Sequence, residues 1–131
     1  MRFTFQFPPT DDAPAQARAS LDVFGQILAP GTLEDLQLLV SELVTNSVRF
    51  GPQWPITLTL AVERDGAVRG EVIDQGDGRA AKPEMRPEPS LDGGWGLYLV
   101  DRVAARWGVR EGSTRVWFEL APRPRPRPRS R

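Results

Sequence analysis

One predicted helix carries a carboxylate and an amide one turn apart. Apolar residues recur nearly all round the helix over residues 32–50, so this helix should be largely buried. Glu42, Asn46 and Arg49 nevertheless recur at spacings of four and three and form one polar stripe along it. A buried carboxylate is costly unless something occupies its face, and a metal ion, a polarised water or a substrate hydroxyl would serve. The alternatives are a network among these three side chains or their exposure to solvent.

A second candidate lies where a predicted strand ends in Asp74, just before Gly76 and Gly78. If Val68 and Val72 face the core, the two-residue period of a strand turns Asp74 to the same side. A buried acceptor on the floor of a cleft can accept a hydrogen bond from the exocyclic amino group of adenine. The two glycines would let the backbone approach a flat ring closely. The other interpretation is a surface turn, in which Asp and Gly are the commonest residues.

A third feature is the glycine-rich stretch of residues 93–96, which leads directly into a predicted helix. Free amides and the positive end of the helix dipole would form an anion site suited to phosphates, whereas a flexible loop before an ordinary helix is the alternative. Residues 76–81 formally match the dinucleotide fingerprint G-x-G-x-x-A. Prolines break the stretch after them, so the crossover helix of that motif cannot follow and we reject it. The three features together favour a purine nucleoside triphosphate.

The spacing of apolar residues predicts the strands and helices that must position these residues. Their order, β-α-α-β-β-loop-α-β-β, predicts an α+β fold: a two-layer α/β sandwich whose mostly antiparallel mixed sheet carries helices on one face. Residues 79–92 contain three prolines and are interpreted as a lid-like loop. We expect one domain over residues 1–121 and a separate tail over 122–131. The main predicted strands are 3–7, 56–62, 68–74 and 114–120, and the predicted helices are 10–28 (capped by Thr10 or Asp11), 32–50 (with Thr32 and Asp35 as a capping box) and 95–106.

The composition excludes several classes of chemistry. None of the 131 residues is cysteine or histidine, which removes disulfides, cysteine-based metal or redox sites, and histidine as a base or phosphate acceptor. The single lysine, Lys82, precedes proline rather than Ser or Thr, so the sequence contains no P-loop. No apolar run approaches the roughly 20 residues that cross a bilayer. The N-terminal residues lack a secretory signal, so we expect a cytoplasmic protein without membrane contact.

Charge is distributed unevenly along the chain. All 17 acidic residues precede position 122, whereas five of the 17 basic residues follow it. Residues 122–131 alternate proline with arginine, a pattern that favours an extended, solvated tail. Such a tail could contact nucleic acid, an acidic partner or the acidic body, but a disordered solubilising segment is the simpler hypothesis. Direct binding of nucleic acid is not expected.

Taken together, the motifs resemble those of the GHKL (Bergerat-fold) ATP-binding superfamily. Within it, the chain looks like the small anti-sigma-factor serine/threonine kinases of bacteria, which belong to the HATPase_c family. Residues 41–49 resemble the N box, residues 74–78 the first glycine box and residues 93–100 the second. Residues 113–118 are similar to the closing strand of that family. The four motifs occur in the family's order, and the likeness spans roughly residues 3–120.

This resemblance implies a role for each candidate residue. Asn46 would coordinate the Mg²⁺ that bridges the phosphates of ATP, and Glu42 would act as general base on an incoming hydroxyl. Asp74 would bind the adenine amino group, assisted by Thr114. Arg18 stands where some relatives use an arginine to contact a partner. The remaining nucleotide contacts implied by the resemblance are Arg49, Gly76, Gly78, Gly94, Trp95, Gly96 and Leu97.

Two functions are compatible with the resemblance. The first is an ATP-dependent protein serine/threonine kinase that phosphorylates an anti-anti-sigma (STAS-type) antagonist and sequesters a sigma factor. Relatives of this kind commonly form homodimers. The second is a non-catalytic ATP-binding regulatory module of the same fold. A self-contained sensor histidine kinase is excluded because the chain contains no histidine.

Overall fold

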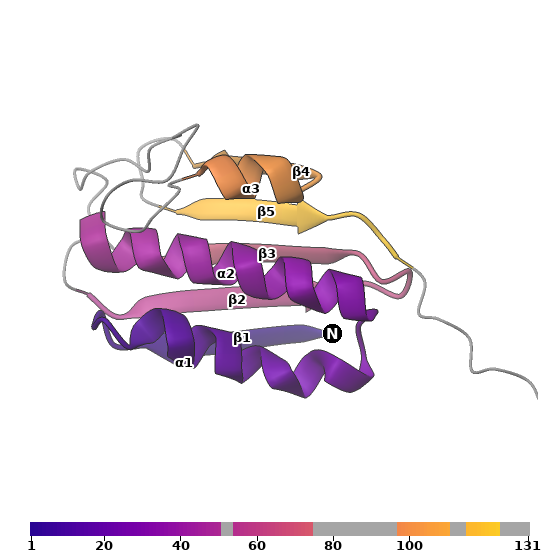
Figure 1. Cartoon of the computed structure of the whole chain (residues 1–131), viewed down its shortest axis with the longest axis horizontal. Helices are drawn as coiled ribbons and strands as arrows, with labels where there is room; N and C mark the ends of the chain where they lie inside the picture. The colour runs from indigo at the N-terminus through magenta and orange to yellow at the C-terminus, as the bar shows by residue number, and fades with distance from the viewer. Residues whose placement is uncertain (51–53, 75–96, 111–114, 124–131) are drawn as a thin grey trace, which may run out of the picture.

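The computed structural model describes residues 1–50, 54–74, 97–110 and 115–123, and of Phe50 only the backbone. Within these ranges five strands form one sheet in the order β1-β2-β3-β5-β4, every pair of neighbours being antiparallel. The helices cover a single face of this sheet, which confirms the predicted α+β sandwich (Figure 1). The elements are β1 (Arg2–Phe7), α1 (Ala13–Ser20), the 3₁₀ helix η1 (Leu21–Gln26), α2 (Pro30–Phe50), β2 (Ile56–Val62), β3 (Val68–Ile73), α3 (Tyr98–Val103), β4 (Arg106–Val109) and β5 (Val116–Leu120).

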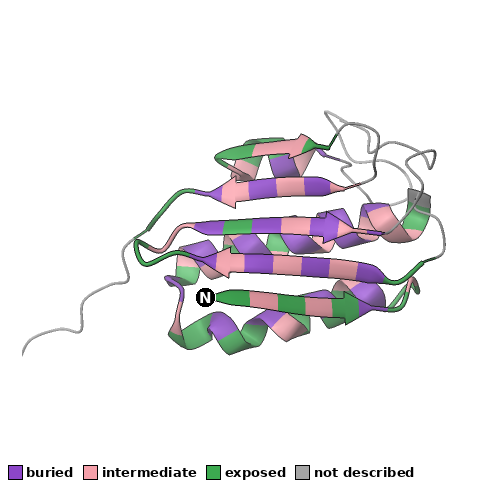
Figure 2. Cartoon of the chain, turned by 180° about the vertical axis from the view of Figure 1, so that it is seen from behind, coloured by how far each residue is buried: buried purple, intermediate pink, exposed green. Residues whose placement is uncertain are grey.

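The sheet has one face buried by the helices and one open face, which Figure 2 shows from behind. In β2 every second residue from Ile56 to Val62 is buried, and the residues between them are half-buried. β3 and β5 repeat this alternation. The register places Leu60, Gly70 and Phe118 side by side, so the buried positions of neighbouring strands share one face. The two-residue period seen in the sequence therefore identifies the core face of the sheet.

Gly70 leaves room for a buried aromatic ring. Phe118 beside it is fully buried. A Cβ atom at position 70 would lie 2.6 Å from Phe118 Cε1 and 2.9 Å from Leu60 Cδ2, inside van der Waals contact. We expect Gly70→Ala to lower the free energy of unfolding by about 1–3 kcal/mol through overpacking. Urea denaturation checks this, with Gly25→Ala as control because a Cβ there meets no atom within 4 Å. Equal unfolding midpoints for the two variants would contradict the packing argument.

The first helical region is shorter and less regular than the sequence predicts. α1 ends at Ser20, and the chain continues as the 3₁₀ helix η1 instead of one α-helix to residue 28. The Ser20 hydroxyl donates a hydrogen bond to the Ala17 carbonyl at 2.6 Å, a local bond that competes with the regular helical pattern. The predicted caps are also wrong, because Asp12 occupies the capping position and makes no side-chain capping bond. η1 still buries Leu21 and Phe24 against the core.

α2 begins two residues earlier than predicted, at Pro30. Proline suits a first helical position because the helix leaves that backbone N–H without a partner in any case. Thr32 is therefore inside the first turn and is buried, so it is not the N-cap of a capping box with Asp35. At 21 residues α2 is long, yet no helix within the described ranges is both long and apolar enough to cross a membrane.

The segment after β5 crosses the end of the sheet and contacts the start of α2; we call residues 121–123 the C-terminal strap. Arg123 Nη2 lies 3.1 Å from Asp35 Oδ2, and a Cβ atom at Gly31 would overlap the Arg123 guanidinium. At Gly66, whose φ of +89° suits glycine, a Cβ would lie 2.8 Å from the Arg123 carbonyl oxygen. The strap thus packs across the β2–β3 turn and fixes the first turn of α2 at that end of the sheet.

The third helix is also shorter than predicted. Its last residue is Val103, and Ala104 is already extended with φ −72° and ψ 142°. The Ala105 N–H donates to the Glu119 carbonyl at 2.8 Å, after which β4 begins at Arg106. The chain therefore leaves the helix to pair with β5, although the apolar spacing in the sequence predicts that the helix continues to residue 106.

Candidate functional site

The two ends of the sheet have different neighbours. The C-terminal strap holds the start of α2 beside the β2–β3 turn, where β3 begins. A 21-residue helix extends about 30 Å. α2 therefore ends at the opposite edge of the molecule, which is also where β3 ends (Figure 1). Asn46 near the end of α2 and Asp74 directly after β3 accordingly lie at the same end of the fold, on the helix side of the sheet.

Asp74 is buried, as the period of β3 predicts. Its exposed fraction is 4%, and Val72 two residues earlier on the same face is 2% exposed. Ile73 between them points to the other face and is half-buried. A carboxylate at such a depth is an acceptor held in low dielectric, which favours one specific donor over water. The burial is confirmed, and the bond to an adenine amino group remains a prediction.

Asn46 is buried with part of its hydrogen-bonding capacity unused. The side chain is 8% exposed, and Nδ2 has no hydrogen-bond partner among the residues that the structure describes. Leaving a buried donor unsatisfied costs about 1–3 kcal/mol, so this amide suits a ligand that supplies an acceptor. A phosphate oxygen would accept from the nitrogen, while the amide oxygen is a hard ligand of the kind that Mg²⁺ prefers. The chemistry of Asn46 therefore fits a magnesium nucleotide.

Glu42 lies one helical turn before Asn46 on the same flank of α2. It is half-buried, whereas Arg49 further along the helix is exposed. The spacing of four brings the carboxylate beside the amide, as the sequence predicts. A half-buried carboxylate keeps access to a hydroxyl that enters from solvent. This position is compatible with a general base, a role that remains a prediction.

An interaction that the sequence did not predict fixes the other flank of α2. Arg18 Nη1 of α1 donates a hydrogen bond to the Ser41 hydroxyl at 2.7 Å. Thr45, one turn later, donates to the Ser41 carbonyl at 2.7 Å. Ser41 therefore connects the two helices directly before Glu42. The sequence suggested a partner contact for Arg18, and in this structure the side chain holds α1 against α2.

Several predicted contacts lie outside the described residues. Leu97 is described and is 2% exposed within the hydrophobic core, at the start of α3. Its side chain therefore packs inward, and any contact with a nucleotide would come from its backbone. The predicted contacts that lie outside the described ranges are Gly76, Gly78, Gly94, Trp95, Gly96, Thr114 and the lid-like loop 79–92.

The acidic side chains that the structure describes do not form a metal site by themselves. Among them, no group of three or more acidic side chains gathers in a way that could hold a metal ion. Mg²⁺ in nucleotide sites is commonly held by one or two protein ligands together with phosphate oxygens and waters. A single amide from Asn46 therefore fits a metal that arrives with the nucleotide, and does not fit a metal bound by the protein alone.

The sequence and the fold both resemble those of known proteins. The sequence matches the histidine kinase-like ATPase domain family over residues 7–120. A search of curated proteins found no match. Among solved structures, the RsbU and RsbW domains of Rv1364c from Mycobacterium tuberculosis are similar, with a TM-score of 0.67 and 23% identity over 95% of this chain. The chain spans about a third of that protein, 34% of its length, so this likeness supports the fold alone.

The family match covers β2 to β5, the helices and the positions of Glu42, Asn46 and Asp74. The five-stranded sheet with helices on one face agrees with the GHKL fold. The chain therefore belongs to the histidine kinase-like ATPase domain family of the GHKL superfamily.

Proposed function

We propose that the protein binds ATP with Mg²⁺ and transfers the γ-phosphate to a serine or threonine of a partner protein. The observation that carries this proposal is the presence of two buried polar side chains, Asn46 and Asp74, at one end of a largely apolar interior. Family membership supports ATP as the nucleotide. The assignment of the hydroxyl acceptor rests on the resemblance to anti-sigma-factor kinases.

Asp74, Asn46 and Glu42 each have a distinct role in the proposed reaction. Asp74 would accept a hydrogen bond from the amino group of adenine, and Asn46 would hold the Mg²⁺ and the phosphates. Glu42 accepts the proton of the attacking serine or threonine hydroxyl, while the hydroxyl oxygen forms a bond to the γ-phosphorus. The bond from that phosphorus to the β–γ bridging oxygen breaks, and ADP leaves. Bound Mg²⁺ supplies charge neutralisation for the phosphates.

The direct test is a phosphoryl-transfer assay. The protein is incubated with γ-labelled ATP, Mg²⁺ and a candidate STAS-type antagonist, and the labelled product is digested to identify the modified residue. Label on a serine or threonine of the antagonist supports the proposal, as does loss of labelling when EDTA removes Mg²⁺. ATP binding without any labelled protein would contradict kinase activity with that antagonist.

The second candidate function is a non-catalytic ATP-binding regulatory module. Family membership favours it equally, because a nucleotide site needs Asn46 and Asp74 whether or not phosphate is transferred. The two candidates differ in the need for Glu42. A binding module needs no general base, so the two candidates are distinguished by whether replacing Glu42 slows a phosphoryl transfer.

We also propose that the partners include a sigma factor and its antagonist, as in the anti-sigma-factor kinases that the chain resembles. The solved RsbU and RsbW domains share the fold and supply the analogy. Co-purification of the protein with a candidate sigma factor, with and without ATP, tests this proposal. Nucleotide-dependent complex formation supports it, and failure to bind any sigma factor of the same cell contradicts it.

Removal of the Pro/Arg tail should leave nucleotide affinity nearly unchanged. The C-terminal strap lies at the β2–β3 end of the sheet, away from Asn46 and Asp74. We expect deletion of residues 124–131 to change the Kd for ATP by less than about threefold, well under 1 kcal/mol. Isothermal titration calorimetry measures this. Deletion of residues 122–131 is the matched comparison, because it also removes Arg123 and should lower the melting temperature. A large loss of affinity from the shorter deletion would refute the expectation.

A further inference from the structure

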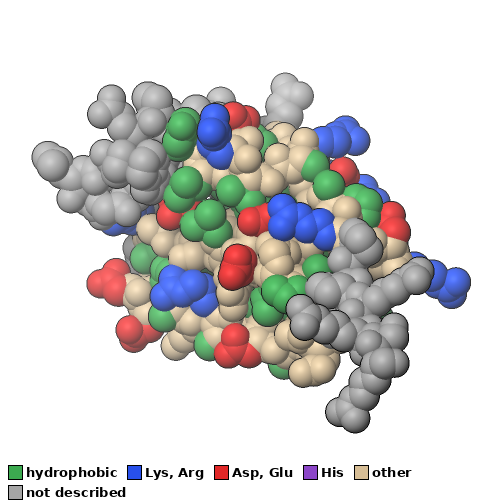
Figure 3. All heavy atoms as spheres, turned by 45° about the vertical axis from the view of Figure 1, so that its right-hand side comes forward, with side chains coloured by type: hydrophobic (Ala, Val, Ile, Leu, Met, Phe, Trp, Pro, Cys, Tyr) green, Lys and Arg blue, Asp and Glu red, His purple; other side chains and the backbone are tan. Residues whose placement is uncertain are grey.

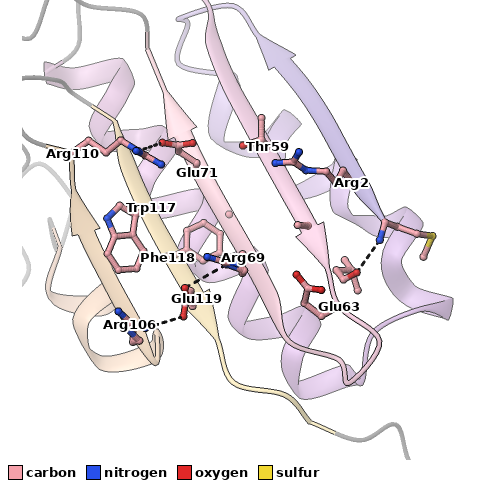
Figure 4. Close-up of a pocket in the computed structure, with 14 residues that line it drawn as sticks. Arg2, Thr59, Glu63, Arg69, Glu71, Arg106, Arg110, Trp117, Phe118 and Glu119 are labelled. Atoms are coloured by element: carbon pink, nitrogen blue, oxygen red, sulfur yellow. Dashed lines mark hydrogen bonds and ion pairs between the residues drawn. The ribbon is translucent and has the colours of Figure 1, made fainter.

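Arginine side chains gather on the open face of the sheet, opposite the helices. They come from β3, from β4 and the residue after it, and from the residue before β5, and they lie around two glutamates that each pair with two guanidinium groups. Figure 4 shows Arg69, Arg106 and Arg110 beside these glutamates. We call this set, together with Arg2 and Glu63 at the rim, the arginine face. Glu119 lies 3.4 Å from Arg69 and 3.9 Å from Arg106, and Glu71 lies 3.0 Å from Arg110 and 3.5 Å from Arg115.

The arginine face is basic although the body of the protein is acidic. Its five arginines and three glutamates leave an excess of two positive charges. Residues 1–121 as a whole carry twelve basic and seventeen acidic side chains. In the oblique view of Figure 3, by contrast, acidic and basic side chains are interspersed. The surplus of positive charge on the open face is therefore a local feature of the sheet.

The arginine face is also hollowed. A depression of about 810 Å³ lies on it, lined partly by small residues such as Thr59, Ala61 and Gly70. Trp117 forms one wall; a Cβ atom at Gly108 would lie 2.8 Å from its indole nitrogen, so the ring rests on the glycine. The guanidinium carbon of Arg106 lies 5.9 Å from the Trp117 ring centroid, a cation–π distance. This wall offers a rigid aromatic surface beside surplus positive charge.

We propose that the arginine face binds an acidic segment of a partner protein. Exposed Arg–Glu pairs contribute only about 0–1 kcal/mol each, so carboxylates of a partner can exchange into them at small cost. The excess positive charge favours an anionic occupant, and Trp117 provides area for its apolar atoms. The chain's own tail has the wrong sign, with five arginines and no acid in residues 122–131. A nucleic acid is the other anionic occupant, and the test below distinguishes it from an acidic peptide.

The arginine face and the nucleotide residues lie on opposite sides of the sheet. Asp74 and Asn46 are on the helix side, whereas Arg69, Glu71 and Trp117 point away from it. Both sites can therefore be occupied at once. The proposal does not rest on the proposed kinase activity, and saturating Mg²⁺–ATP should leave binding at the arginine face unchanged.

The test uses fluorescence anisotropy with a fluorescein-labelled peptide of ten glutamates as the probe. We expect the double variant Arg69→Gln/Arg106→Gln to raise the Kd of the peptide about tenfold at low salt, because it removes the excess charge. The matched control Arg64→Gln/Arg102→Gln makes the same change in total charge at two exposed positions off this face. It should bind nearly as the wild type does. Raising NaCl from about 0.05 M to about 0.5 M should weaken wild-type binding by screening.

Circular-dichroism melting establishes that each variant is folded. If the double variant does not fold, Arg2→Gln at the opposite rim provides a second variant for the same measurement. Equal peptide affinity in the double variant and its control overturns the proposal. Tighter binding of a single-stranded DNA probe, lost in the same variant, would replace it with a nucleic-acid site. A concentration-dependent dimer in sedimentation that the double variant abolishes, without peptide binding, would replace it with a second copy of the chain.

Discussion

Replacing Asp74 with asparagine is expected to weaken ATP binding by roughly 10- to 150-fold, equivalent to about 1.5–3 kcal/mol. The side chain is buried directly after β3, so its carboxylate would meet a ligand in low dielectric rather than in water. Asparagine keeps the shape but turns one of the two acceptor oxygens into a donor, which would face the amino group of adenine donor to donor. Equilibrium titration with a fluorescent ATP analogue measures the change.

Glu71→Gln is the matched control for this prediction. It makes the same carboxylate-to-amide change on the same strand, but on the open face, where Glu71 pairs with Arg110 at 3.0 Å. We expect its affinity for ATP to stay within about twofold of the wild type, because loss of an exposed ion pair costs at most about 1 kcal/mol of stability. If Asp74→Asn binds ATP as well as Glu71→Gln does, Asp74 is not the adenine acceptor.

Replacing Glu42 with glutamine is expected to slow phosphoryl transfer by roughly 10²- to 10⁴-fold while the Kd for ATP changes by less than about threefold. Glutamine has nearly the same size and cannot accept the proton of the attacking hydroxyl. The nucleotide contacts assigned to Asn46 and Asp74 remain, so binding and catalysis should separate. Single-turnover labelling of the antagonist at saturating ATP measures the rate, and calorimetry measures the affinity.

Glu34→Gln provides the control on the same helix, since Glu34 is exposed near the start of α2 and far from Asn46. Its labelling rate should match that of the wild type. A Glu42→Gln rate equal to the control rate would remove Glu42 from the reaction and would favour a role in binding alone. Loss of ATP affinity in Glu42→Gln would instead place Glu42 among the nucleotide contacts.

The regular parts of the fold could be predicted because one local pattern decides them. β2 alternates strictly and has the predicted bounds, residues 56–62. The same period, carried through β3, predicts that Asp74 is buried, and it is. The helical spacing of Glu42 and Asn46 likewise follows from the 3.6-residue turn, whatever packs around them.

The parts that differed depend on contacts between distant residues. Asp35 looked like a capping-box acid, but it pairs with Arg123 from the other end of the chain. The last predicted turn of α3 is lost because the chain pairs with β5 at Glu119. The unsatisfied amide of Asn46 is a property of its surroundings, which sequence spacing does not report. Local propensity is overridden in each case by partners that only the folded chain brings together.

The C-terminal strap has a practical consequence for handling the protein. Because Arg123 contacts Gly66 and Gly31, the chain leaves the described part of the fold at the end remote from Asn46 and Asp74. An affinity label or a biosensor surface attached beyond this point is expected to leave the end of the fold that carries Asn46 and Asp74 accessible to solvent. Attachment near Trp54 would instead bring the support close to that end of the fold, because β2 begins at Ile56 and its Thr57 pairs with Ile73, directly before Asp74.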